Sequence, residues 1–497
     1  MRAHPTLRGS VNDRDHRAPR GRPARRPDAP PRPRLLIEHW LPVAELGVES
    51  QREGSAAIHP PLHRLHVWWA RRPLIVSRAA VLASLLPAWR ADWPPQLHER
   101  FPTEESYRAW FLRLMGIQGD PVAARKLLAW ARDRGITRQL SPYGYKRAFT
   151  YGPTEEHLEL FFALTELNWG KGIPSVLDPT AGGGSISFEA LRFGFTTHAN
   201  ELNPVASIIL AATLDYPARF GSELAPTIFK WGKRVAERVR EQMRGFFPYP
   251  QDGVPDVYLW ARTVACPVTG KPVPLSPNWW LQKGSDPVAV RVLCQPDWPE
   301  CRFEILRGAA ALRANPDQGT IRRGVAVSPW TGDAIDGDYI KREAQAGRMG
   351  QQLYAVGIKT PRGIEFRPPT EADLAAVAAA EAELARRLPG WLASGIVPDE
   401  EIPEVSNDPR PRHYGMTRWR DLFAPRQLLA LGTVVETLRA MAPEIAAALP
   451  PDQARAVRTY LAFAVDKLAD YNSRMSRWEN TRNVIKGAFD RHDFSMK

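Results

Sequence analysis

The sequence predicts an α/β fold built on a doubly wound, mostly parallel sheet of the Rossmann type, with helices on both faces. Three observations lead to this prediction. The apolar stretch 175–178 ends in a glycine-rich turn, a helical pattern follows over 186–193, and a second apolar stretch occupies 196–201. A strand, a helix and a second strand at this spacing are typical of a parallel pair joined by a right-handed crossover. A further helix is expected over 204–214.

Two regions precede this core. Residues 1–34 contain ten arginines and three aspartates among many prolines, without hydrophobic periodicity. Such a segment buries too little apolar surface to offset the entropy of ordering, so we expect a disordered basic tail. A helical N-terminal domain is expected over 35–150. Within it, apolar residues recur at helical spacing over 75–85, and Pro73 suits the first turn of that helix.

The remaining chain divides into an α/β core over 151–221, an insertion over 222–400 and a C-terminal helical segment over 401–497. The insertion begins with a basic helix and continues as short strands rich in Pro, Trp and Gly. Thr370 and Asp373 form a capping-box pattern that predicts the start of another helix. Two long amphipathic helices are expected at 424–448 and 451–478.

The composition is that of a globular protein, with 44% hydrophobic and 24% charged residues. No stretch approaches the roughly eighteen apolar residues of a membrane helix, so no membrane association is expected. Three cysteines are too few for a disulfide framework and favour a reducing cytoplasm. The net charge of +13 favours a nucleic-acid partner through counterion release. The alternative is the solvated surface of an arginine-rich protein.

The strongest motif is DPTAGGGS at 178–185. A strand that ends in a glycine-rich turn opening a helix lets the backbone approach a ligand and points free N–H groups at it. Glu201, at the end of the second strand, is placed to accept both hydroxyls of a ribose. Ser187 stands where the dinucleotide fingerprint needs glycine, and no lysine follows as in the phosphate loop of NTPases. A chance glycine turn in an α/β protein is the alternative.

The Asp-Pro opening of this motif resembles the first motif of amino-methyltransferases that act on nucleic acid. The resemblance implies a class I methyltransferase fold with S-adenosylmethionine as the cofactor. The turn then holds the methionine part of the cofactor, and Glu201 holds its ribose. The expected cofactor-binding residues are Asp178, Pro179, Thr180, Ala181, Gly182, Gly183, Gly184, Glu201 and Asn203.

Further segments resemble a family of adenine-specific DNA methylases that have an N-terminal domain of unknown function and an internal zinc-ribbon insertion. The most specific is HVWWARRP at 66–73, since two tryptophans followed by Ala-Arg-Arg-Pro are improbable by chance. The other segments are Ile37-Glu38-x-x-Leu41-Pro42, DPTAGGGS, NELNP at 200–204, YLWARTVACP at 258–267, Arg418-Trp419 with LFAPRQ at 422–427, and ADYNS at 469–473 with Arg477-Trp478. The resemblance implies methylation of an adenine amine in DNA, in a restriction-modification or phage-defence system.

The zinc ribbon departs from the family pattern. Its paired Cys-x-x-Cys knuckles correspond here to CPVTG at 266–270 and SPWTG at 328–332, so hydroxyls replace three of the four thiolates. Neutral hydroxyls are poor zinc ligands beside Cys and His. Cys294 and Cys301 are too far apart in sequence to form a knuckle. We therefore expect no metal, and hydrophobic packing in its place.

The catalytic motif is the second departure. Enzymes that methylate exocyclic amines carry an Asp/Asn/Ser-Pro-Pro-aromatic motif, whose polar groups accept from the amine and whose ring stacks on the flipped base. None of the Pro-Pro pairs in the 497 residues fits it. In the family this motif lies beyond the point where the present chain stops. We therefore expect a truncated or split form and assign no catalytic residue.

The expected partners are DNA and a second polypeptide that supplies the motif, or other subunits of a defence system. Two alternatives stay open. One is a catalytically inactive subunit that binds S-adenosylmethionine and DNA, and the other is an RNA methyltransferase.

Two clusters interleave aromatic rings with cations, an arrangement that suits contacts with nucleic acid. The candidates for nucleic-acid binding are Trp69, Arg71, Arg72, Arg418 and Arg426. Core packing of the tryptophans is the alternative. Arg474 and Arg477 are expected on the solvated face of the last helix. The clustered His59, His63 and His66 are expected to have a structural role rather than to bind a metal.

Overall fold

The structure is a computed structural model, and it describes residues 34–54, 60, 62–136, 142–170, 172, 174–248, 253–405 and 408–490. Apart from Arg34, the predicted basic tail lies outside the described residues, and so does His59. The chain is mixed α/β and divides into two compact units. Unit 1 is drawn from Met1–Gly54, Pro73–Val176 and Glu189–Thr197, and unit 2 from Ser55–Arg72, Leu177–Phe188 and His198–Lys497.

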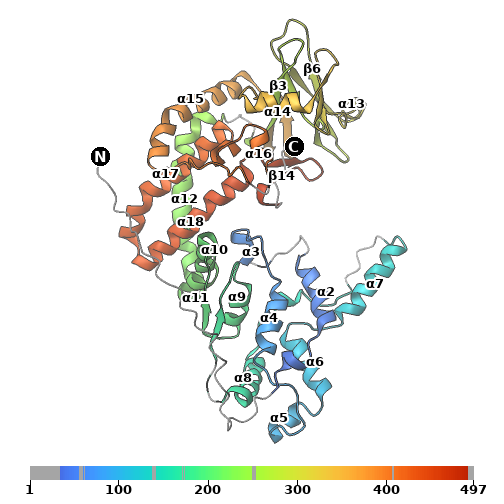
Figure 1. The fold of residues 1–497 in the computed structure, drawn as a ribbon, viewed down its shortest axis with the longest axis vertical. Helices are drawn as coiled ribbons and strands as arrows, with labels where there is room; N and C mark the ends of the chain where they lie inside the picture. Colours follow the sequence, from blue (N-terminus) through green and yellow to red (C-terminus); the bar gives the residue numbers. More distant parts are fainter. Residues whose placement is uncertain are drawn as a thin grey trace, which may run out of the picture. The chain divides into compact units, whose positions relative to one another are not determined.

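Unit 1 is helical (Figure 1). It contains α1 (Leu36–His39), α2 (Val43–Gly54), α4 (Leu74–Ala83), α5 (Pro95–Arg100), α6 (Glu104–Leu114), α7 (Pro121–Asp133), α8 (Glu155–Trp169) and the second half of α9 (Ser185–Arg192). Thr103, Asp120 and Thr154 accept an N–H of the first turn of α6, α7 and α8, which explains where these helices begin. The buried Glu53 does the same for α4, because its carboxylate accepts the Leu74 N–H at 2.7 Å.

The core of unit 1 forms around α4. The predicted apolar face is confirmed, since Ile75, Ala79 and Leu82 are at most 2% exposed. Aromatic residues from other segments complete this core, namely Tyr107, Phe111, Phe161, Phe193 and Phe195. The last two lie in the short chain segment that follows the glycine turn.

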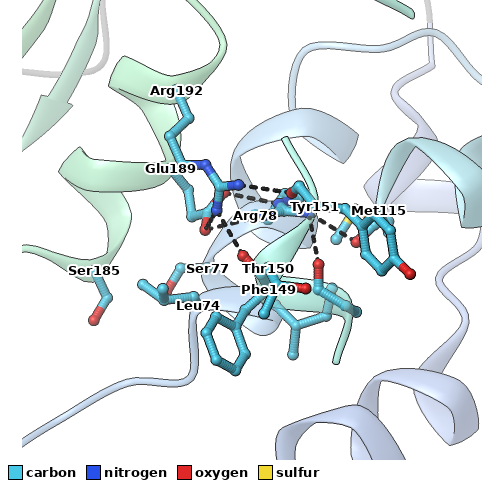
Figure 2. Close-up of polar contacts among 12 residues, drawn as sticks. Leu74, Ser77, Arg78, Met115, Phe149, Thr150, Tyr151, Ser185, Glu189 and Arg192 are labelled. Carbon is cyan, nitrogen blue, oxygen red and sulfur yellow. Dashed lines mark hydrogen bonds and ion pairs between the residues drawn. The ribbon is translucent and has the colours of Figure 1, made fainter. Parts of the chain in front are cut away.

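Arg78 is also on α4 and is 1% exposed. Its guanidinium donates to both carboxylate oxygens of Glu189, at 2.7 and 3.3 Å, and to the Met115 carbonyl at 2.9 Å. Arg192 donates to the same carboxylate at 3.0 Å and to the Phe149 carbonyl at 3.0 Å. Figure 2 shows this network. The carboxylate of Glu189 thus joins two arginines and holds the second half of α9 within unit 1.

Unit 2 contains the remaining elements (Figure 1). Its helices are α3 (Leu62–Leu65), α10 (Pro204–Leu210), α11 (Tyr216–Phe220), α12 (Leu224–Met243), α13 (Ala309–Arg313), α14 (Gly337–Gln345), α15 (Glu371–Ala393), α16 (Arg410–His413), α17 (Pro425–Ala448) and α18 (Pro451–Tyr471). The strands that follow the crossover are β3 (Val254–Ala265), β4 (Pro272–Leu275), β5 (Trp280–Gln282), β6 (Val288–Leu293), β7 (Arg302–Arg307), β8 (Ile321–Arg322), β9 (Val325–Val327), β10 (Ala334–Ile335), β11 (Gly350–Thr360), β12 (Gly363–Arg367), β13 (Arg477–Glu479) and β14 (Val484–Lys486).

Helices α12, α15, α17 and α18 pack side by side in a bundle. The capping box predicted at Thr370 is confirmed at the start of α15. The antiparallel sheets have the strand orders β12-β11-β3-β4, β5-β6-β7, β10-β9-β8 and β13-β14. The first two share an apolar core that includes Leu259, Trp279 and Phe366. In the part of the chain that the structure describes, no helix is long and apolar enough to cross a membrane.

The crossover is formed by β1 (Val176–Asp178), α9 and β2 (Thr197–Ala199). Val176 N–H donates to the Thr196 carbonyl and Asn200 N–H to the Asp178 carbonyl, each at 2.9 Å, so the two strands run in the same direction. The predicted strand–helix–strand unit is therefore confirmed.

The doubly wound sheet predicted around this crossover is not formed by the described residues, where every other strand pair is antiparallel. A parallel sheet grows by further crossovers that return to it. After β2 the chain instead continues as α10, a π-helical segment, α11 and α12. No third strand in the described ranges joins β1 or β2.

Candidate functional site

The glycine turn connects β1 to α9 and is held by its own backbone. Ala181 N–H donates to the Asn200 carbonyl at 3.0 Å, and Gly184 N–H donates to the Ala181 carbonyl at 2.8 Å. Gly182 and Gly184 have φ of +52° and +80°, values that favour glycine. The turn is therefore a defined structure between two parallel strands, and Pro179 and Thr180 are exposed at its start.

Asp178 ends β1 and is 5% exposed. Its carboxylate accepts the hydroxyl of the fully buried Ser187 at 3.1 Å. This contact ties the end of the strand to the first turn of α9. Asp178 thus has a structural partner, and Ser187, which separates the motif from the dinucleotide fingerprint, provides it.

Glu201 lies after β2 and folds back onto the turn. Its Oε2 accepts the Gly182 N–H at 2.7 Å, and its Oε1 accepts the N–H groups of Leu202 and Asn203 at 2.9 Å. The N–H groups of Asn203 and Gly182 lower the pKa of the Glu201 carboxyl below its ordinary value. The carboxylate is thus ionised at neutral pH and is directed at the turn.

Asn203 caps α10. Its Oδ1 accepts the N–H groups of Val205 at 2.9 Å and Ala206 at 3.3 Å. An Asn in this position satisfies the first donors of a helix. Asn203 was predicted to bind the cofactor. In the structure its side chain caps the start of α10.

Packing explains all three glycines. A Cβ at Gly182 lies 2.8 Å from Trp68 Nε1, and one at Gly183 lies 3.3 Å from Trp68 Cβ. A Cβ at Gly184 lies 2.7 Å from Leu210 Cδ2. The glycines thus accommodate Trp68 on one side of the turn and Leu210 of α10 on the other. The sequence analysis did not predict this contact of Trp68. Three consecutive glycines at 182–184 were the available signal, because they indicate that another group packs closely against the turn.

Free backbone donors remain at the start of α9. The N–H groups of Gly183, Ser185 and Ile186 have no acceptor among the described residues. Unpaired N–H groups at a helix N-terminus attract anionic groups such as carboxylates and phosphates. Together with the Glu201 carboxylate, they fit a ligand that carries both an anionic group and hydroxyl groups.

The HVWWARRP segment meets the glycine turn at two places. Trp68 covers Gly182 and Gly183, and the Arg72 carbonyl accepts the Ser185 hydroxyl at 2.9 Å. The side chains of Trp69, Arg71 and Arg72 are exposed. Within the described ranges, neither Arg71 nor Arg72 pairs with a carboxylate. The structure therefore brings together two motifs that are more than a hundred residues apart.

The second predicted nucleic-acid cluster is engaged in contacts within the protein. Arg418 pairs with Asp399 at 3.0 Å and with Glu401 at 3.2 Å. The prediction that Arg426 contacts nucleic acid is wrong. Arg426 is 6% exposed, and its guanidinium lies 3.9 Å from the centre of the Tyr258 ring. It also donates to the Phe246 carbonyl at 3.3 Å. A guanidinium buried against aromatic rings does not reach a phosphate.

The two degenerate knuckles face each other. Ser328 Oγ lies 3.2 Å from Cys266 Sγ, and an N–H-to-carbonyl bond closes each turn. Burial raises the pKa of the Cys266 thiol, but hydrogen bonds from Ser328 and Thr269 outweigh it and lower the pKa to about 7. Among the described residues, no group of three His, Cys, Asp or Glu side chains is arranged to hold a metal ion.

The other two cysteines lie against each other instead. Cys294 and Cys301 follow β6 and precede β7, and their sulfur atoms are 2.9 Å apart. Cys301 is buried, and burial raises the pKa of its thiol. The pair therefore lies at the end of β6 and the start of β7, and the Cys301 thiol also reaches the Pro272 carbonyl, just after the first knuckle, at 3.8 Å.

The last helix is shorter than predicted. It ends at Tyr471, so Arg474 lies beyond it and not on its solvated face. The Arg474 backbone N–H donates to the Leu422 carbonyl at 2.8 Å, and its side-chain Nε is buried without a hydrogen-bond partner in the described structure. His66 has the structural role predicted for it, since its Nε2 lies 3.3 Å from Asp466 of α18.

Comparison with known proteins identifies one region. Residues 40–113 match a family model described as a protein of unknown function, DUF1156. This range includes the HVWWARRP segment and, in full, three helices of unit 1, namely α2, α4 and α5. No curated protein and no solved structure matches the chain significantly. What the comparisons establish is therefore a likeness, over residues 40–113, to a family without an assigned activity.

Proposed function

We propose that this chain binds S-adenosylmethionine at the glycine turn and provides the methyl-donor half of a DNA methyltransferase that acts on adenine amines. The observation that supports this most is the arrangement at the ends of β1 and β2. Free N–H groups begin α9, and the ionised carboxylate of Glu201 lies beside them, 2.7 Å from the Gly182 N–H. The sequence resemblance to adenine-specific methylases, in a restriction or phage-defence setting, supplies the reaction.

Each group has a separate task. The N–H groups of Gly183, Ser185 and Ile186 would hold the carboxylate of the methionine part, and Glu201 would accept the ribose hydroxyls. Trp68 closes one side of the turn and restricts the space beside it. When bound, the cofactor supplies an electrophilic methyl group, so the protein has chiefly to align the amine with it. The exposed Trp69, Arg71 and Arg72 are the proposed contacts with DNA.

Calorimetry on the purified chain tests the cofactor assignment. We expect S-adenosylmethionine to bind, and Glu201→Ala to weaken it by about tenfold or more, the effect of one charged hydrogen-bonding group. Glu223→Ala, at an exposed glutamate of the same unit, is the matched control and keeps full affinity. Thermal melts separate a lost ligand contact from a disrupted turn, because Glu201 also accepts three backbone N–H groups. Equal affinity in the wild type and Glu201→Ala contradicts the ribose assignment.

One observation favours a second candidate. The 497 residues contain no Asp/Asn/Ser-Pro-Pro-aromatic motif, which is the part that binds the reacting amine. The second candidate is therefore a catalytically inactive subunit that binds S-adenosylmethionine and DNA.

Methylation assays distinguish the two candidates. The chain is assayed alone and with the product of the adjacent downstream reading frame, on DNA and on RNA of the same sequence at one stated salt concentration. Activity that needs the second product supports a split enzyme. Cofactor binding without activity in either mixture supports the non-catalytic subunit, and transfer to RNA alone refutes DNA as the substrate.

A further inference from the structure

Three segments singled out in the sequence converge on one pocket of unit 2. The pocket has a volume of about 320 Å³ and is lined by Arg262, Arg420 and Arg474. Arg262 belongs to the YLWARTVACP segment on β3, Arg420 lies between Arg418-Trp419 and LFAPRQ, and Arg474 directly follows ADYNS. Segments separated by about 150 and 50 residues thus place three guanidinium groups around one hollow.

Arg262 lacks an anionic partner. Its guanidinium lies 3.5 Å from the sulfur atoms of Met349 and Met416, and within the described residues these are its hydrogen-bond acceptors. Thioether sulfur is a weak acceptor. Burial, with repulsion from Arg474, lowers the pKa of Arg262 to about 10, so the side chain remains charged at neutral pH.

Arg474 also forms no ion pair with a carboxylate among the described residues, although Asp421 attracts it through space. Its Nε is buried and has no hydrogen-bond partner in the described part of the chain. Burial also lowers the pKa of its guanidinium. Arg420, by contrast, pairs with Asp399. The pocket therefore contains two arginines that form no ion pair with a carboxylate among the described residues.

The carboxylate that lines the pocket attracts the Arg474 guanidinium through space, but within the described residues it forms no hydrogen bond with either arginine. Asp421 accepts the backbone N–H groups of Thr417 and Arg418, at 3.0 and 2.8 Å, and so caps the turn before α17. The apolar lining, which includes Leu384, Leu388 and Phe423, provides no counter-charge either. A partly buried charge without an ion-pair partner is costly, so two neighbouring guanidinium groups favour an anion between them.

We propose that this pocket binds a phosphate group, with Arg262 and Arg474 as its donors. The planar guanidinium presents several N–H groups in a fork that matches the oxygens of phosphate. The phosphate belongs either to a free anion or small phosphorylated molecule, or to the backbone of a nucleic acid. This assignment is independent of the glycine turn and does not rest on the proposed function.

Thermal melts and calorimetry on the full chain test the proposal, with sodium phosphate as the probe and sodium chloride at equal ionic strength as the reference. We expect phosphate to raise the melting temperature of the wild type. Arg262→Met and Arg474→Gln each weaken phosphate binding by about tenfold or more. Arg386→Gln, at an exposed arginine of α15, is the matched control and changes nothing.

Melting temperatures measured without phosphate show whether a variant is still folded. Without phosphate, Arg262→Met is expected to melt at or above the wild-type temperature, because a partly buried charge without an ion-pair partner has been removed. A second arm replaces phosphate with a short DNA duplex. Binding of phosphate identifies a free anion as the source, and binding of the duplex alone, lost in both variants, identifies the nucleic-acid backbone. If the wild type and both variants respond equally to phosphate and also respond equally to the duplex, the proposal is overturned.

Discussion

Single side chains at the glycine turn serve the protein's own backbone before any ligand. Both oxygens of Glu201 accept backbone N–H groups, and Asn203 caps α10. The residue types at the ends of the strands were predictable, since a carboxylate and a glycine turn form a pattern of local sequence. Their partners were not, because the Gly182 N–H reaches Glu201 only when β1 and β2 are paired.

The buried pair of Arg78 and Glu189 is expected to dominate the stability of unit 1. Arg78→Met leaves Glu189 buried with one arginine fewer, and we expect a loss of about 3–5 kcal/mol in the free energy of unfolding. Arg100→Met breaks an exposed pair with Glu156 and is expected to cost about 0–1 kcal/mol. Chemical denaturation of both variants measures the difference. Equal losses contradict a dominant role for the buried pair.

His66 makes the stability of unit 2 depend on pH. Its hydrogen bond with Asp466 raises the pKa of the imidazole. The pair therefore stabilises the fold below the unfolded pKa of about 6.5, and this contribution is lost as the pH rises through the folded pKa. Asp466→Asn should lower the melting temperature more at about pH 6 than at about pH 8.5.

Asp452→Asn is the control for this dependence. Asp452 also lies on α18, but it pairs with Arg219, which does not titrate in this range. Its effect on the melting temperature should be the same at both pH values. A constant effect of Asp466→Asn as well would remove His66 as the source of the pH dependence.

At the scale of elements, most starts and ends follow from local sequence. The capping box at Thr370, the helix after Pro73 and the helix predicted at 424–448 all occur within a residue or two of their expected bounds. The last helix ends at Tyr471 rather than near 478, and Arg477 and Trp478 form a strand that pairs with β14. Periodicity did not reveal this end, since the hairpin is stabilised by Trp478 donating to the Leu281 carbonyl, nearly two hundred residues away.

The glycine turn tolerates no side chain at its last glycine. Gly184→Ala places a methyl group 2.7 Å from Leu210 Cδ2 at a φ of +80°, so it combines overpacking with backbone strain. We expect a loss of about 2–5 kcal/mol. Gly395→Ala has a φ of +64° but open space around its Cβ, and is expected to cost about 1–2 kcal/mol. Denaturant titrations measure the free energy of unfolding of both variants. A similar loss in both would show that contact with Leu210 does not contribute to the effect of Gly184→Ala.

At the scale of the whole molecule, the two units are not successive stretches of chain. Unit 1 takes residues from three segments, and the third, Glu189–Thr197, follows the glycine turn. Unit 1 therefore extends beyond the predicted domain over 35–150, because it also includes residues after 150, among them Glu189–Thr197. Composition and periodicity do not reveal such exchanges, because they depend on which distant segments pack together.

A fragment experiment tests this division. A fragment of residues 34–150 lacks Phe161, Phe193 and Phe195 and the carboxylate partner of Arg78. We expect it not to unfold cooperatively on heating, because its core is incomplete. A fragment of residues 34–200 contains all three segments of unit 1 and should show a single sharp transition by circular dichroism. A sharp transition in the shorter fragment would show that the segment after the glycine turn is dispensable.

The sequence by itself determined the elements whose stability is local: the capped helices, the glycine turn and the parallel crossover around it. These depend on residues within about twenty positions of each other, so their patterns are visible in the chain. Only the tertiary structure decided that Trp68 covers the turn, that Arg426 is buried against Tyr258 and that Arg262 and Arg474 share a pocket. Burial of a charge or a ring depends on the segments that surround it, and those come together only when the chain folds.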